Sequence, residues 1–189
     1  MGLSDSELFS KDRKNYLYTA LFCEENIWHL VQQLKTEGFD IDSMTVLLLS
    51  NPQQQIVLFN QSCRPVGESV IWDYHVILQL EKNNQQWICD FDSLLNFPVS
   101  KKSYFSASFP HPGSLQEQYQ MFIRSIPATS YLQHFSSDRS HMRDVINAEQ
   151  FPSYPPILVK ATDLPITLTE YCDMRLSLFD GSKVSLYSC

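Results

Sequence analysis

The sequence predicts an α+β fold, and three observations support this prediction. Between residues 27 and 34, apolar residues recur every three or four positions, which is the period of one helical face. Between residues 45 and 93, apolar and polar residues alternate in short segments, as they do in antiparallel strands. After residue 97 the patterns are shorter and mixed. A helix, then a meander of strands, then mixed elements is the order typical of α+β domains.

The composition indicates one globular domain and argues against two classes of partner. The chain has 189 residues, of which 43% are hydrophobic and 13% aromatic, so we expect one domain over residues 1–189 with a flexible segment at 1–15. The net charge of −7 argues against a nucleic-acid partner, which requires clustered Lys and Arg. No apolar run approaches the roughly 18 residues of a membrane helix, so no membrane partner is expected.

The helix is predicted over residues 20–37. Thr19 is a candidate cap, and Glu24 and Glu25 lie in the first turn, where acidic side chains suit the positive end of the helix dipole. Gly38 follows directly and is a typical stop signal. These signals place the start of the helix within a few residues of position 23.

Cys23 therefore lies at the predicted helix start. Unpaired backbone N–H groups there favour a thiolate over a thiol. A lone cysteine is more often structural, so a nucleophilic role requires a histidine and an orienting acid elsewhere in the chain. The five cysteines form no CxxC pair, which gives no support to a zinc site. Free thiols indicate a reducing compartment, and we expect the cytoplasm, with the nucleus as a second location.

The remaining elements follow from local patterns. Four strands are predicted at residues 45–50, 55–60, 69–80 and 86–93. Later segments are predicted as a helix at 114–126, a polar segment at 130–141, a proline-rich loop or rim at 151–157, a turn or strand at 162–169 and a last short strand at 181–189.

His75 interrupts the most regular of these strands. It shares a face with Asp73, whereas Trp72 alternates to the opposite face and is expected to pack in the core. An imidazole among aliphatic residues costs free energy unless it has a partner. Asp90 and Asp92 project from the same face of the next strand, so either can supply that partner.

Two hairpin registers remain open for this pair. If Asn83 and Asn84 form a two-residue turn, Asp92 lies opposite His75. If residues 81–84 form a four-residue loop, Asp90 lies opposite instead. The two asparagines favour the tight turn and hence Asp92.

The chain order Cys, His, Asp, with the cysteine at a helix start and the others on strands, is that of papain-like and transglutaminase-like folds. The papain signature CGSCW is absent around the cysteine, so a peptidase is weakly supported.

Several short blocks stand out when the chain is read in order. They are Cys23 to Trp28 (CEENIW), Trp72 to Val76 (WDYHV), Asp90 to Asp92 (DFD), Phe97-Pro98, Ser130 to Leu132, Phe135 to Met142 and Tyr154 to Pro156. Together they resemble the family of protein N-terminal glutamine amidohydrolases, also called the WDYHV family. The resemblance runs from about residue 16 to 157 and is fainter at 99–118 and 181–186.

The resemblance implies a reaction and a set of site residues. It implies a catalytic domain that deamidates the N-terminal glutamine of proteins or peptides, through a thioester, with no cofactor or metal and as a monomer. The triad carries over to Cys23, His75 and Asp90, which calls for the wider hairpin loop. The implied cellular role is in an N-degron pathway.

Reading only the first residue of a chain requires an acceptor for its α-ammonium. Glu24, Asp73 and Asp92 are the candidates near the expected site. We expect a Cys23–His75 ion pair to keep the sulfur charged. The alternatives are a transglutaminase-like acyltransferase, a cysteine peptidase and a non-enzymatic module that binds N-termini.

Overall fold

The computed structural model describes residues 12–110, 112–160 and 163–188. Within these ranges no helix is long and apolar enough to cross a membrane. Most of the segment predicted to be flexible, residues 1–11, lies outside them. Residues 12–15 contain a 3₁₀ turn at Arg13–Asn15, and the Arg13 guanidinium donates hydrogen bonds to the carbonyls of Phe91, Ser93 and Leu95.

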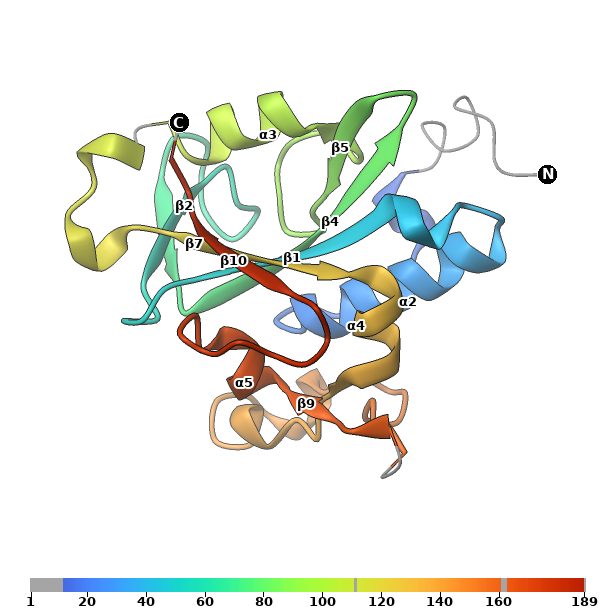
Figure 1. Ribbon diagram of the computed structural model, residues 1–189. Coiled ribbons are helices and arrows are strands. Elements are labelled where there is room, and N and C mark those ends of the chain that lie inside the picture. The colour runs from blue at the N-terminus through green and yellow to red at the C-terminus, as the bar shows by residue number, and fades with distance from the viewer. Residues whose placement is uncertain (1–11, 111, 161–162, 189) are drawn as a thin grey trace.

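The α+β prediction is confirmed by a six-stranded sheet with helices on both faces (Figure 1). The strand order is β10-β7-β1-β4-β5-β6, and every neighbouring pair is antiparallel. The strands are β1 (Met44–Ser50), β4 (Tyr74–Lys82), β5 (Gln85–Cys89), β6 (Val99–Ser100), β7 (Phe122–Pro127) and β10 (Lys183–Leu186). Two small sheets pair β2 (Ile56–Phe59) with β3 (Ser69–Trp72), and β8 (Phe135–Ser136) with β9 (Ile166–Thr167).

The helices divide the core into two layers. On one face α2 (Cys23–Thr36), α4 (Ala128–His134) and α5 (Leu168–Cys172) pack on the sheet around Leu48, Val76 and Leu78. On the other face α3 (Lys101–Ser108) packs against β5, β6 and β2, and its Tyr104 and Phe105 belong to a core cluster with Leu47 and Ile77. The sheet is therefore buried on both faces, and β4 is buried along most of its length in spite of the polar residues in its sequence.

Helix α2 begins at Cys23, as its sequence signals predict, and Gly38 ends it with φ +90°. The predicted cap is wrong. The N-cap position is Phe22, which makes no side-chain capping bond, and the role of holding the preceding loop falls to Asn26. The buried Asn26 amide donates to the Thr19 carbonyl and accepts from the Thr19 N–H, each at 2.8 Å.

The predicted strand 69–80 is broken at Asp73, and this break decides which side chains meet. The segment before it, β3, pairs with β2, whereas the segment after it, β4, enters the main sheet. The Asp73 carboxylate accepts from the Tyr74 N–H at 2.9 Å, and its carbonyl accepts from the Ser50 hydroxyl at 2.6 Å. Because regular alternation stops here, Trp72 and His75 lie on the same side. Their rings stack with centroids 6.2 Å apart, so the expectation that Trp72 lies opposite is wrong.

The β4–β5 hairpin has the tight turn that its asparagines favour. Asn83 and Asn84 both have positive φ, and Leu78 pairs with Cys89, which is the register of a two-residue turn. The wider loop expected from the family resemblance is wrong. The ladder ends at Cys89, however, so Asp90 leaves the strand and reaches His75 without lying opposite it.

The predicted helix at 114–126 is wrong. Its first part contains 3₁₀ turns at Pro112–Ser114 and Glu117–Tyr119, and its second part is β7. Strand β7 lies between β1 and β10, and its Arg124 is fully buried under carbonyls of the C-terminal region. The short strand predicted at the C-terminus is confirmed as β10.

Candidate active site

A cavity of about 380 Å³ opens beside the start of α2. Its lining includes Cys23, Trp72, Asp73, His75, Asp92 and His141. Cys23 reaches it from the helix and His75 from the strand behind, so the structure brings these two predicted residues together around one space.

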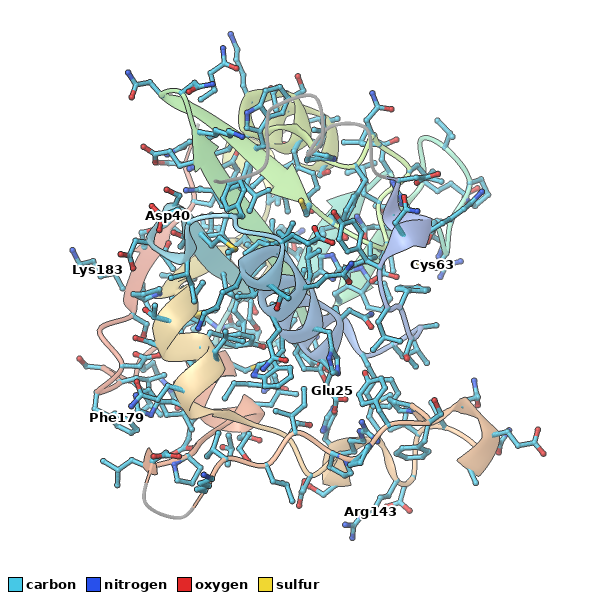
Figure 2. The ribbon with its side chains drawn as sticks, turned by 90° about the vertical axis from the view of Figure 1, so that its right-hand side faces the viewer. Glu25, Asp40, Cys63, Arg143, Phe179 and Lys183 are labelled. Carbon is cyan, nitrogen blue, oxygen red and sulfur yellow. The ribbon has the colours of Figure 1, made fainter. Side chains whose placement is uncertain are left out.

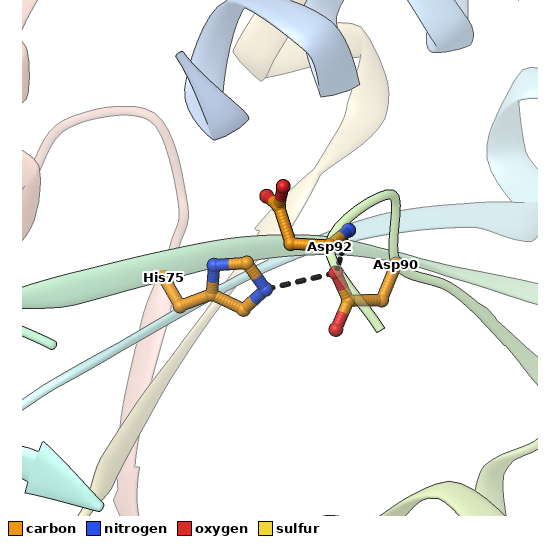
Figure 3. A group of neighbouring side chains, drawn as sticks. All are labelled: His75, Asp90 and Asp92. Carbon is orange, nitrogen blue, oxygen red and sulfur yellow. Dashed lines mark hydrogen bonds and ion pairs between the residues drawn. The ribbon is translucent and has the colours of Figure 1, made fainter. Parts of the chain in front are cut away.

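Asp90 is the partner of His75 (Figure 3). Its Oδ1 lies 2.9 Å from His75 Nε2, and both side chains are buried. The same oxygen accepts the Asp92 N–H at 2.9 Å. Its Oδ2 accepts the Tyr104 hydroxyl at 2.8 Å and the Gln61 amide at 3.3 Å. Four donors therefore fix this carboxylate and, through it, the plane of the imidazole.

The electrostatics of this pair stabilise the ionised carboxylate and strengthen the imidazole as a base. Burial opposes ionisation of His75, but the charge and hydrogen bond of Asp90 outweigh it, and the pKa of His75 is raised. Burial also disfavours ionisation of Asp90, yet His75 and the donors around it bring its pKa below the usual value. With Nε2 held by Asp90, His75 keeps Nδ1 for exchanging a proton.

The surroundings of Cys23 favour the protonated form of its sulfur. Its sulfur lies 3.6 Å from Glu24 Oε2, and among the described residues it makes no hydrogen bond with His75. Burial, and next the negative charge of Glu24, raise the pKa of Cys23 well above its ordinary value, although a backbone hydrogen bond from Val76 acts in the opposite direction. The contacts of the described residues include no Cys23–His75 ion pair, and the expected pair stays a prediction.

The loop before Cys23 is held in an unusual conformation. Leu21 has φ +70°, a left-handed conformation that costs a non-glycine residue about 1 kcal/mol or more. The Asn26 clamp on Thr19 stabilises this conformation from within the helix. Leu21 lines the cavity, and 42% of its surface is exposed.

A buried ion pair joins the start of α2 to the wall of the cavity. The Arg139 guanidinium donates to both oxygens of Glu25, at 2.9 and 2.7 Å, and also to the carbonyls of Tyr154 and Pro155. Arg139 belongs to the segment that follows β8. Figure 2 shows Glu25 on the side of α2 that faces this segment, with Arg143 at the segment's outer edge. The segment contributes His141, Met142 and Val145 to the cavity. The proline-rich loop 151–157, predicted as a rim, does not line it.

The three candidate acceptors for an ammonium group occupy different positions. Asp73 and Asp92 line the cavity, and Asp92 accepts a hydrogen bond from the Tyr18 hydroxyl at 2.6 Å. Glu24 is fully buried behind Cys23 and does not line it. The sequence did not single out Tyr104, Gln61 or Arg139. Their contacts join segments far apart in the chain, and only the position of Arg139 inside a family-like block hinted at a role.

One group of side chains has spacing that a metal ion can use. Ligand atoms of His75, Asp90 and Asp92 lie within 4.8 Å of one another. Each Asp90 oxygen, however, already accepts two hydrogen bonds. This geometry is that of a hydrogen-bonded imidazole and carboxylate with a second carboxylate nearby.

Comparison with known proteins shows the family of this chain. The profile of the N-terminal glutamine amidase family matches residues 18–186. A protein N-terminal glutamine amidohydrolase of Bos taurus is 33% identical over 181 residues, which cover 94% of this chain and 86% of the relative. The Homo sapiens protein of the same name is 32% identical over 179 residues, covering 94% and 87%. That of Drosophila ananassae is 37% identical over 146 residues, covering 75% and 71%. The chain therefore belongs to the N-terminal glutamine amidase family.

Proposed function

We propose that this protein hydrolyses the side-chain amide of an N-terminal glutamine to glutamate and ammonia, with Cys23 as nucleophile, His75 as general acid and base, and Asp90 as the group that orients His75. The observation that carries this proposal is the buried His75–Asp90 pair at 2.9 Å, in a cavity that also contains Cys23, in a chain of this family.

The first half of the reaction forms a thioester. Nδ1 of His75 takes the Cys23 proton, and the sulfur attacks the carbon of the substrate carboxamide. The charge that develops on the carboxamide oxygen is stabilised by a backbone donor, for which the Cys23 N–H in the first turn of α2 is suited. His75 then returns the proton to the nitrogen, the C–N bond breaks, and ammonia leaves.

The second half hydrolyses the γ-glutamyl thioester. A water molecule takes the place of ammonia, and His75 removes its proton as it attacks the same carbon. The C–S bond breaks and the sulfur regains a proton, which leaves glutamate at the N-terminus of the substrate. Throughout, Asp90 keeps the imidazole in one orientation and stabilises its protonated form.

The substrate's α-ammonium is accepted by the carboxylates that line the cavity. Asp92 is favoured because it is half-buried and lies near both His75 and Asp90, whereas Asp73 is exposed. Glu24 is not proposed for this role because it does not reach the cavity. The arrangement of a nucleophilic cysteine at a helix start against an antiparallel sheet with His and Asp is that of papain-like and transglutaminase-like enzymes.

The test is an ammonia-release assay on three peptides, with glutamine first, asparagine first and glutamine internal. We expect release from the first peptide alone, because asparagine, one methylene shorter, misplaces its carbonyl by about 1 Å, which can cost on the order of a hundredfold. Comparable release from internal glutamine would instead indicate a transglutaminase-like active site, and cleavage of the backbone would indicate a peptidase.

A further inference from the structure

We propose that Glu24 holds the Cys23 thiol protonated while the cavity is empty, and that the positive charge of a bound α-ammonium is what allows the sulfur to ionise. This inference rests on the proposed function and deepens it, because it makes Glu24 a positioning residue that reserves the nucleophile for free N-termini.

The first argument is the geometry around Glu24. Its side chain is fully buried, and Oε2 accepts the Tyr74 hydroxyl at 3.1 Å and faces the Cys23 sulfur at 3.6 Å. Oε1 is buried without a hydrogen-bond partner, and His141 Nε2 is 3.8 Å away. An ionised carboxylate at this distance accepts a hydrogen bond from a thiol but repels a thiolate.

The second argument is the charge of the cavity. Among the described residues that line it there are two carboxylates, Asp73 and Asp92, and two imidazoles, but no lysine or arginine. Arg139 is paired with Glu25, and Arg13, whose charge reaches Asp92, does not line the cavity. The site thus has no permanent cation of its own, and a primary ammonium brings the missing charge.

Other titratable groups also face Glu24, and they come from several elements. They are Cys23 and Glu25 on α2, Tyr74 and His75 on β4, Tyr131 on α4, Arg139 and His141 in the segment after β8, and Cys172 on α5. Burial and the neighbouring Glu25 raise the pKa of Glu24 to about 7, so at neutral pH the residue still holds negative charge in a substantial fraction of molecules.

The sequence of events follows from these contacts. In the empty cavity the proton stays on the sulfur, and Glu24 accepts its hydrogen bond. When an ammonium group binds beside Asp92, it offsets the surrounding negative charge. The thiol proton then moves to Nδ1 of His75, which leaves a thiolate and an imidazolium. A glutamine inside a chain has no ammonium group and does not trigger this transfer.

The test measures the pH dependence of Cys23 alkylation by iodoacetamide, with the modified cysteine identified by peptide mass spectrometry. Glycinamide, a primary ammonium without a side chain, should lower the midpoint pH by about one unit or more, as expected for a nearby charge. N-acetylglycinamide, its neutral counterpart, should not. Equal effects of the two amides would overturn the proposal.

The decisive variant is Glu24→Gln, which keeps the shape of the side chain and removes its charge. Its alkylation midpoint should fall by about one unit or more without any amine, and the added effect of glycinamide should shrink. The preference in kcat/KM for N-terminal over internal glutamine should fall at least tenfold. Glu117→Gln, at an exposed position on a 3₁₀ turn, is the matched control and should behave as the unaltered protein.

Other outcomes decide against the inference. An unchanged midpoint in Glu24→Gln would overturn it, and a tenfold rise in KM with an unchanged midpoint would make Glu24 the ammonium acceptor instead. If Glu24→Gln fails to fold, Tyr74→Phe tests the same idea, because losing the hydroxyl makes the Glu24 charge less stable and should lower the midpoint by a smaller amount. Alkylation does not require turnover, so absence of ammonia release would refute the proposed function without touching this result.

Discussion

The orienting acid offers the sharpest test of the proposed triad. Asp90→Asn removes the charge beside His75 and keeps the shape of the side chain. The change should be tolerated by the fold, since the Tyr104 hydroxyl can accept as well as donate, and Gln61 Oε1 is buried without a partner and can turn toward the new amide. Loss of activity will therefore report on chemistry and not on unfolding.

The expected loss can be worked from the contact itself. A hydrogen bond to a charged group contributes about 1.5–3 kcal/mol, and each 1.36 kcal/mol is a factor of ten in rate. The bond between Asp90 and His75, at 2.9 Å, thus accounts for roughly 10- to 200-fold. An amide also allows the wrong tautomer of the imidazole, which in related triads has cost about 10⁴-fold. We expect kcat to fall by about 10² to 10⁴.

The assay is steady-state ammonia release from a peptide with N-terminal glutamine, with kcat and KM measured separately. Asp92→Asn is the matched control, because Asp92 contacts Tyr18 and lines the cavity but does not hold the imidazole. It should raise KM more than it lowers kcat. A kcat for Asp90→Asn within threefold of the unaltered protein, or a larger loss of kcat in Asp92→Asn, would refute this assignment of the acid.

Three further predictions follow from contacts already described. Cys23→Ala and His75→Ala should each abolish ammonia release while circular dichroism shows that the fold is kept; the melting temperature should stay close to that of the unaltered protein in Cys23→Ala and fall in His75→Ala, which leaves Asp90 buried without its imidazole, and turnover by a folded Cys23→Ala variant would remove this cysteine from the mechanism. Arg139→Met should lower the free energy of unfolding by about 3–5 kcal/mol in urea titrations, because Glu25 is then left charged and buried, and adding Glu25→Gln should recover part of the loss. Since the pKa of Asp90 is depressed, its ionised form stabilises the fold above about pH 4 and this contribution is lost as the pH falls further. Between pH 5 and pH 2 the free energy of unfolding should therefore fall less steeply with pH in Asp90→Asn than in the unaltered protein. Equal slopes in the two proteins would contradict the pairing.

The residues of the site were predictable from the sequence because their signals are local. The first turn of α2 carries its own start and stop signals, so Cys23 was expected at a helix start. His75 was conspicuous as an imidazole in an apolar strand, and two acids followed one hairpin later. Choosing between Asp90 and Asp92 required both the turn chemistry of the hairpin and the family resemblance. The tight turn expected from Asn83 and Asn84 is present, yet the acid implied by the family resemblance, Asp90, is the one that contacts His75.

The features that could not be predicted from the sequence mostly depend on contacts between segments far apart in the chain. The segment 114–126 has an apolar spacing compatible with a helix, but its second half completes the sheet between β1 and β10. Arg139 reaches Glu25 across 114 positions of the chain, and no periodicity in either segment indicates this contact. Trp72 was misplaced for a different reason. Assigning side chains to alternate faces assumes an unbroken strand, but the carbonyl and carboxylate of Asp73 take part in hydrogen bonds that interrupt this strand.

The break at Asp73 also limits how this site can be moved into another protein. Transplanting the five residues from Trp72 to Val76 onto a regular strand would place the indole and the imidazole on opposite faces, because they are three positions apart. A successful graft would need a hydroxyl that donates to the Asp73 carbonyl, as Ser50 does here. It would also need a second sheet to pair with the strand that ends at Trp72. The portable unit is therefore a corner between two sheets, and protein engineers should search for scaffolds that already contain such a corner.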